Sequence, residues 1–181
     1  MDALVLVDIQ NDYFPRGAME LVQMEQAAGN AAAVLEIFRK ESRPVYHIQH
    51  IAMDEAAGFF LPDTPGARIH EAVAPLATEP VITKHFPNSF RETDLLERLQ
   101  GQGAQRVVIC GAMSHMCIDA TTRAAFDHGL ECTVVEDACA TRDLVFKDRQ
   151  IPASDVHSSF MAALSQAYAR VVALSEFRQN L

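Results

Sequence analysis

The stretch RVVICGAMSHMCIDA (106–120) decides the fold class of this 181-residue chain. Its first part, RVVICG (106–111), is a continuous apolar run typical of a strand that is buried on both faces. After a short turn, residues 115–128 show the apolar spacing of a helix and end before Gly129. The stretch therefore predicts a strand, a turn and a helix in succession, with Cys117 at the start of the helix.

The same alternation of strand and helix recurs along the chain. Buried strands are expected at 3–8, 44–50, 80–85, 106–111, 131–137 and 170–177. Helices are expected at 24–42, 93–103, 115–128 and 152–169. Apolar strands that alternate with helices indicate a parallel sheet covered on both faces. We therefore predict an α/β fold: a doubly wound, three-layer α/β/α sandwich with a mostly parallel sheet of about six strands.

Length and composition favour one domain over residues 1–181. A chain of 181 residues is somewhat longer than the commonest domain size and can bury one sizeable core. No internal repeat or low-complexity segment divides it. Residues 51–79 form the longest expected connection, and a loop of that length in a compact domain usually shapes a pocket or a subunit contact.

Charge and hydropathy exclude several classes of partner. The net charge is −9 and no basic cluster exceeds two residues, so neither nucleic acid nor an anionic membrane is expected as a partner. No segment approaches the roughly 18 apolar residues of a membrane-spanning helix. The first ten residues, MDALVLVDIQ, do not resemble a signal peptide, so we expect a cytoplasmic protein. The four cysteines are then expected to be thiols, and the lack of a C-x-x-C pair disfavours structural zinc.

Three residues able to do chemistry lie at strand ends: Asp8 and Lys84 close the first and third expected strands, and Cys117 follows the fourth across a short turn. Ligands of open α/β sheets bind at the carboxyl ends of the strands. A cation or a helix N-terminus lowers the pKa of a nearby thiol, and a carboxylate can exchange protons with it. Taken singly, the cysteine could be core packing, the aspartate a turn former and the lysine a solvated strand end. Their common position at one sheet edge favours catalysis.

Several motifs closely resemble those of the isochorismatase-like cysteine hydrolases, a superfamily that includes nicotinamidases and N-carbamoylsarcosine amidohydrolase. The motifs are DIQND (8–12), K…NSF…TDL (84–95) and GAMSHMC (111–117), followed by EDACATRDL (136–144) and IPASDVH (151–157). The resemblance thus covers nearly the whole chain. It implies a hydrolase that acts on a small-molecule substrate and forms a homo-oligomer, either a dimer or a tetramer.

The resemblance also implies roles for individual residues. Asp8, Lys84 and Cys117 match the catalytic triad, and a cis peptide bond is expected between Ala112 and Met113. The backbone N–H groups of Met113 and Cys117 would form the oxyanion hole. Isochorismatases proper cleave a vinyl ether without a nucleophilic cysteine. The presence of Cys117 therefore favours hydrolysis of a C–N bond, amide or carbamoyl, through a thioester. Vinyl ether hydrolysis and nicotinamidase activity are the alternatives.

No metal or other cofactor is expected to be required. Nicotinamidases of the superfamily hold a metal with an Asp-x-His motif at the end of the second strand, where this chain has HIQHIAMD (47–54). His47 and His50 are three residues apart on an expected strand and so point to opposite faces. Only His50, nearer the strand end, is expected to face a pocket, where His70 could join it.

The remaining candidates flank the strand ends. The residues expected to line a substrate pocket are Phe14, His50, Phe86, Phe90 and Met116. Cys110 and Cys132 are expected in the core, and Cys139 in a turn after the fifth strand.

Two other classes of function remain as alternatives. A haloacid-dehalogenase-like phosphatase would need a second acid where the chain has Gln10, and it would give Cys117 no role. A binding or redox-responsive module without enzymatic activity is compatible with the same fold.

Overall fold

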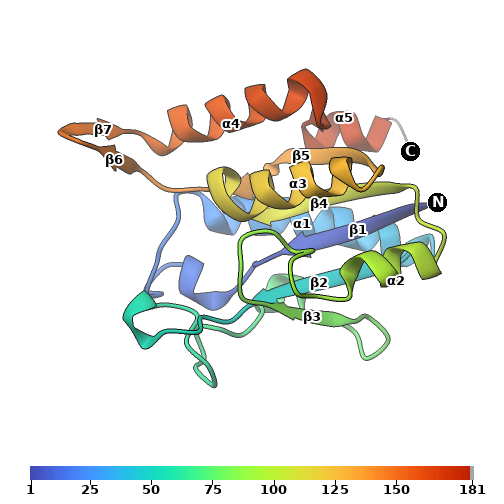
Figure 1. Ribbon diagram of the computed structural model, residues 1–181, viewed down its shortest axis with the longest axis horizontal. Coiled ribbons are helices and arrows are strands. Elements are labelled where there is room, and N and C mark those ends of the chain that lie inside the picture. The colour runs from blue at the N-terminus through green and yellow to red at the C-terminus, as the bar shows by residue number, and fades with distance from the viewer. Residues whose placement is uncertain (180–181) are drawn as a thin grey trace.

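A computed structural model describes residues 1–179, so the last two residues of the expected 1–181 domain lie outside the described part. Its centre is a six-stranded sheet in the order β3-β2-β1-β4-β5-β8 (Figure 1). The strands are β1 (Asp2–Val7), β2 (Val45–His50), β3 (Val81–Lys84), β4 (Arg106–Ala112), β5 (Glu131–Ala140) and β8 (Arg170–Val172). Every neighbouring pair is parallel, which confirms the predicted doubly wound α/β fold.

The strand order defines where a site should lie. From β1 the chain builds outward to β2 and β3, and then returns to the other side of β1 to build β4, β5 and β8. The order therefore reverses between β1 and β4, and this switch point opens a crevice at the carboxyl ends of these two strands. Asp8 directly follows β1, and the turn that carries Cys117 directly follows β4.

Five α-helices within residues 1–179 cover the two faces of the sheet, which gives the three layers. They are α1 (Met24–Lys40), α2 (Leu95–Gly101), α3 (Asp119–Asp127), α4 (Ala153–Ala167) and α5 (Leu174–Gln179). Side chains of α1 and α5 pack with one set of sheet residues, and side chains of α2, α3 and α4 pack with the other. In Figure 1, α1 lies behind the strands and α3 lies in front of them. The two apolar cores follow from the strand period of two, because successive side chains point to opposite faces.

The longest helix, α1, shows why these segments are helical. Its buried positions include Ala27, Ala31, Val34, Leu35 and Phe38, which recur at helical spacing along one face. Its sequence is rich in alanine and other good helix formers, and two basic residues in its last turn favour the negative end of the helix dipole.

The strand predicted at 170–177 is wrong beyond its first residues. Only Arg170–Val172 is a strand, and Leu174–Gln179 forms α5. Leu174 and Phe177 are both buried and three residues apart, a spacing that places them on one face of a helix rather than of a strand. The N–H of Leu174 donates to Oδ1 of Asp137 at 2.8 Å, which satisfies a backbone group at the start of this helix.

Other details of the secondary structure also differ from the sequence prediction. β5 continues to Ala140, so Cys139 is a buried strand residue and not part of a turn. Helix α2 spans Leu95–Gly101 with Asp94 at its N-cap, and it is shorter at both ends than the predicted helix 93–103. Residues 144–151 form a hairpin that was not predicted, with strands β6 (Leu144–Phe146) and β7 (Arg149–Ile151). The hairpin projects from the body in Figure 1.

The connections carry three short 3-10 helices within the described chain: η1 (Asn11–Tyr13), η2 (Glu55–Ala57) and η3 (Glu71–Val73). The predicted helix at 115–128 opens instead with a π-turn, η4 (Ser114–Ile118), before α3 begins. None of the helices in residues 1–179 has the length and apolar character that crossing a membrane requires.

Candidate active site

Asp8, Lys84 and Cys117 come together at the switch point, as the sequence predicts. Nζ of Lys84 lies 2.7 Å from Oδ2 of Asp8 and 3.4 Å from Sγ of Cys117. The three residues are almost completely buried, with exposed fractions of 0% for Asp8, 1% for Lys84 and 5% for Cys117. Lys84 ends β3, on the far side of β2, and only a long side chain can bridge that distance to the crevice.

The backbone aims the carboxylate and the thiol. Asp8 has a φ of 53°, in the left-handed region, at the point where the chain leaves β1. Before the thiol, Gly111 has a φ of +128°, and a Cβ at this position would lie 1.9 Å from the carbonyl oxygen of Val7. Only glycine allows β4 to approach β1 this closely. The peptide bond between Ala112 and Met113 is cis, as the resemblance implies.

His50 is a fourth member of this cluster. Nζ of Lys84 lies 2.9 Å from Nδ1 of His50. An ammonium group only donates hydrogen bonds, so Nδ1 accepts and the proton of the neutral ring lies on Nε2. The ammonium thereby donates to Cys117 and His50 and forms an ion pair with Asp8, and these three contacts fix its orientation.

Burial and charge set the protonation states. Burial raises the pKa of the Cys117 thiol, the negative charge of Asp8 raises it further, and the positive charge of Lys84 lowers it only in part. The sequence prediction is correct that Lys84 lowers the pKa of the Cys117 thiol. It is wrong about the sum of all contributions, which raises this pKa. Burial lowers the pKa of Lys84, but Asp8 and Cys117 outweigh it and the net shift is upward. The resting site therefore holds a thiol beside a carboxylate–ammonium ion pair.

Burial, followed by the charge of Lys84, lowers the pKa of His50 from 6.5 to about 4. Between these values the unfolded chain binds a proton that the folded chain excludes, so stability is complete above pH 6.5 and falls as pH drops toward 4. His50→Gln retains an acceptor for Lys84 but has no titrating ring. We expect this variant to lack about 3 kcal/mol of the pH dependence of the unfolding free energy, and less if solvent reaches the His50 ring. Urea denaturation of both proteins between pH 4 and 7 measures the difference. Parallel stability curves would show that the His50 ring titrates normally in the folded protein.

The cluster does not fit a divalent cation. Ligand atoms of Asp8, His50 and Cys117 lie within 4.8 Å of one another, a spacing that a metal ion would accept. However, Nζ of Lys84 already contacts all three residues and supplies the positive charge at their centre. A metal would bring further positive charge against a buried ammonium, which is strongly unfavourable.

The other two histidines considered for a metal have separate contacts. Nε2 of His47 lies 2.9 Å from Oε2 of Glu79, outside the site cluster. The ring of His70 stacks on Phe14 with centroids 3.6 Å apart, and its Nδ1 accepts a hydrogen bond from the N–H of Ala72 at 3.2 Å.

The expected pocket residues have different surroundings. His50 belongs to the cluster, and Met116, next to the nucleophile, is 41% exposed. The guanidinium of Arg91 lies 3.5 Å from the ring centroid of Phe86. Phe90 packs with the ring of His128, which follows α3 at the end opposite to Cys117, so this position does not favour contact with a substrate.

Loop 51–79 supplies a wall of the site, and sequence reasoning did not single out its aromatic residues. The ring of Phe60 lies 4.5 Å from that of Tyr13 and 5.9 Å from that of His50. Burial raises the pKa of Tyr13, and the charges of Cys117 and Asp8 raise it further. The sequence feature that could have indicated these aromatic residues is the pair FF (59–60), because it lies in a loop longer than a simple connection between two strands requires.

Gln10 ties this loop to the sheet. Its Nε2 donates to the carbonyl of Ala67 at 2.7 Å and to that of His50 at 2.9 Å, and its Oε1 accepts from the N–H of His50 at 2.8 Å. A haloacid-dehalogenase-like phosphatase would have its second acid at position 10. Here the amide of Gln10 instead binds backbone groups of Ala67 and His50. Motif DIQND positions the loop and the strand end around Asp8.

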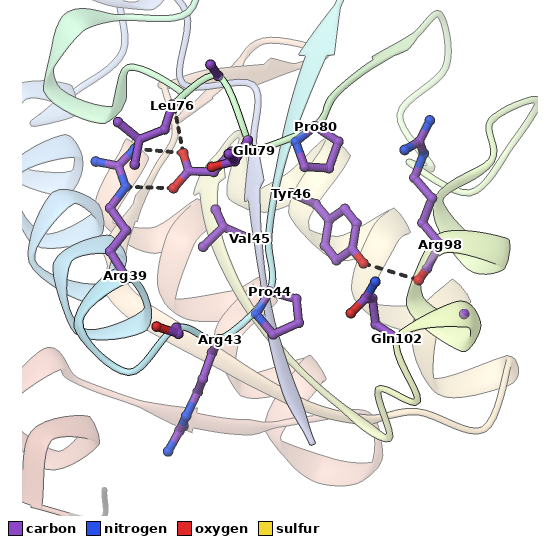
Figure 2. Close-up of a pocket in the computed structure, with 14 residues that line it drawn as sticks. Arg39, Arg43, Pro44, Val45, Tyr46, Leu76, Glu79, Pro80, Arg98 and Gln102 are labelled. Atoms are coloured by element: carbon purple, nitrogen blue, oxygen red, sulfur yellow. Dashed lines mark hydrogen bonds and ion pairs between the residues drawn. The ribbon is translucent and has the colours of Figure 1, made fainter.

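A separate cavity of about 890 Å³ lies at the other edge of the sheet (Figure 2). It is lined by residues that precede or begin the strands, such as Pro44, Tyr46 and Pro80, and by Arg39 and Arg98. Figure 2 shows Arg39 paired with Glu79, an ion pair of 2.7 Å. None of the three residues Asp8, Lys84 and Cys117 lines this cavity, and it lies away from the carboxyl ends of the strands, so it is not the candidate active site.

Comparisons with known proteins identify the family of the chain. The sequence profile of the Isochorismatase domain matches residues 2–176. The isochorismatase family protein YddQ of Bacillus subtilis (strain 168) is 54% identical over 175 residues, 97% of each chain. A crystal structure of an isochorismatase-type hydrolase from Oleispira antarctica superimposes with a TM-score of 0.93 at 50% identity, covering 97% of this chain and 95% of that one. The chain therefore belongs to the isochorismatase family and is a hydrolase of that family.

Relatives with more specific names are more distant. Streptothricin hydrolase of Streptomyces noursei is 32% identical over 167 residues, which cover 91% of this chain and 56% of that protein. The shared family defines the fold and the general class of reaction, and the substrate has to be argued from the site.

Proposed function

We propose that the protein hydrolyses a C–N bond, amide or carbamoyl, in a small molecule through a thioester on Cys117. The observation that carries this proposal is the contact of one buried ammonium, that of Lys84, with both Asp8 and Cys117 at 2.7 and 3.4 Å. A thiol, a carboxylate and a fixed cation in one water-poor crevice are the groups that covalent acyl transfer requires.

In the first half-reaction, Asp8 takes the proton of the Cys117 thiol as the sulfur attacks the carbonyl carbon. The raised pKa of the thiol makes this transfer concerted with attack, because a free thiolate is unfavourable in the buried resting site. The backbone N–H groups of Met113 and Cys117 stabilise the oxyanion. Asp8 then gives the proton to the departing amine or ammonia, and the thioester remains on sulfur.

In the second half-reaction, Asp8 takes a proton from water as the water attacks the thioester. The C–S bond breaks, the acid product leaves and the thiol regains a proton. Lys84 keeps its charge throughout, balances the carboxylate and holds it near the sulfur. His50, which accepts from the same ammonium, keeps Lys84 in this orientation.

The names of relatives support the C–N reaction over vinyl ether cleavage. Besides streptothricin hydrolase, maleamate amidohydrolase of Pseudomonas putida is 32% identical over 117 residues, covering 65% of this chain and 50% of that protein. Nicotinamidase 3 of Arabidopsis thaliana is 24% identical over 191 residues. The presence of the thiol in a complete triad is the feature that an ether hydrolysis would leave unexplained.

Ammonia or amine release across small amides, ureido acids and nicotinamide tests the proposal, with Cys117→Ala as the matched control. We expect release from at least one of these classes by the wild-type protein and none by the variant. Phosphate release that needs magnesium and survives in Cys117→Ala would instead support the phosphatase alternative.

A further inference from the structure

The turn that precedes Cys117 is held from behind by residues outside the triad. Ser114, the first residue of this turn, is fully buried. Its Oγ lies 3.2 Å from the carbonyl oxygen of Ala140, at the end of β5, and 2.8 Å from Nδ1 of His157. A fully buried hydroxyl between two fixed partners cannot rotate to meet a substrate, so it serves to fix the backbone that carries it.

His157 lies in the second turn of α4, and Glu136 lies in β5. Nε2 of His157 is 3.3 Å from Oε2 of Glu136, and 21% of the His157 side chain is exposed. A continuous chain of side chains, Glu136–His157–Ser114, thus connects the strand and the helix to the turn. The motif IPASDVH (151–157) ends at this histidine, and the triad chemistry gives it no role.

The donors and acceptors fit this arrangement. The carbonyl of Ala140 only accepts, so the single proton of the Ser114 hydroxyl is directed to it. The oxygen of Ser114 then accepts from Nδ1–H of His157. The carboxylate of Glu136 only accepts, so Nε2 donates to it when the ring carries a proton on both nitrogens. A second tie lies beside the first: Nδ1 of His115 is 2.6 Å from Oγ1 of Thr141, the residue after Ala140. Consecutive residues of the turn are therefore bound to consecutive residues at the end of β5.

We propose that His157 is a positioning residue for the oxyanion hole. Through Ser114 it fixes the turn in which Met113 and Cys117 present their backbone N–H groups to the developing oxyanion. This inference rests on the proposed function, since an oxyanion forms only if a carbonyl is attacked. The inference predicts that His157 affects reactions that form an oxyanion and leaves the nucleophilicity of the Cys117 thiol unchanged.

The structure offers a route for chemical rescue. A cavity of about 310 Å³ is lined by His157 and Glu136, with Ser154 and Ser158 on the same helix. Removing the imidazole ring enlarges this cavity next to Ser114. Free imidazole is small enough to enter it and to donate to the vacated hydroxyl oxygen.

The test compares His157→Ala with Ser158→Ala, a neighbour on the same helix that lines the same cavity but is not a member of the chain Glu136–His157–Ser114. We expect His157→Ala to lower kcat for amide hydrolysis by about 10- to 100-fold, with KM changed less than about twofold. Alkylation of Cys117 by iodoacetamide should stay within about twofold of the wild-type rate, because that substitution forms no oxyanion. Added imidazole should restore part of kcat in His157→Ala only.

Two kinetic outcomes would overturn the inference. One is an unchanged kcat in His157→Ala, and the other is a parallel loss of hydrolysis and alkylation without rescue, which means general disruption. Hydrogen exchange of the backbone amides of residues 113–117 adds a measurement that needs no substrate. We expect faster exchange there in His157→Ala than in Ser158→Ala, and equal exchange would contradict the inference. If the wild-type protein hydrolyses no C–N substrate, the proposed function fails, and the exchange data still decide whether His157 fixes the turn.

Discussion

Cys117→Ala is expected to lower turnover of the C–N substrate at least about a thousandfold, because the covalent route needs the sulfur atom. The remaining groups can still bind the substrate and polarise its carbonyl. KM should therefore change much less than kcat, and steady-state kinetics separates the two.

A matched control removes a sulfur atom elsewhere. Cys132 is also buried, on β5, and its Sγ lies within hydrogen-bonding distance of the backbone carbonyls of Thr122 and Leu130. Cys132→Ala should keep kcat near the wild-type value despite some loss of stability from the cavity it creates. Near-normal activity in Cys117→Ala would refute the covalent mechanism, whatever Cys132→Ala does.

Lys84→Met is expected to have the largest effect on stability as well as to abolish activity. The substitution keeps most of the side-chain volume but leaves the carboxylate of Asp8, which is 0% exposed, without its ion-pair partner at 2.7 Å. Removing one partner of a buried ion pair costs about 3–5 kcal/mol. Urea denaturation at pH 7 measures this loss of unfolding free energy.

The double variant Asp8→Asn/Lys84→Met separates stability from catalysis. It removes both charges, so the unpaired buried carboxylate disappears and most of the lost stability should return. Activity should not return, because neither the proton acceptor nor its cation is present. Lys40→Met, which removes an exposed pair with Glu36, should leave both stability and activity nearly unchanged. A double variant as unstable as Lys84→Met would show that the ion pair is not the cause.

The central sheet could be predicted because each of its first five strands carries its own local signal. Continuous apolar runs, separated by helical spacing, mark a buried parallel strand independently of the rest of the chain. The strand prediction at 170–177 was wrong because Leu174 and Phe177 continue the apolar segment of β8. These two buried residues are too few to reveal a helical spacing in the sequence. The hairpin of β6 and β7 was missed because each strand has three residues, too few for a clear alternation.

The positions of Asp8, Lys84 and Cys117 could be predicted from topology alone, since strand ends of a parallel sheet share one edge. Contacts between distant segments could not. The bond from Lys84 to His50 joins residues 34 apart, and the bond from Ser114 to His157 joins residues 43 apart. The net direction of the Cys117 pKa shift also depends on how completely the surrounding segments exclude water, which no local pattern encodes.

The most direct test of the account is the mass of the enzyme during turnover. Acid quenching of the wild-type protein with its C–N substrate, followed by peptide mapping, should reveal an acyl group on the sulfur of Cys117, removable by hydroxylamine and absent from Cys117→Ala. An acyl group on a different residue, or continued turnover by Cys117→Ala with no acylated peptide, would contradict the central claim that Cys117 is the nucleophile.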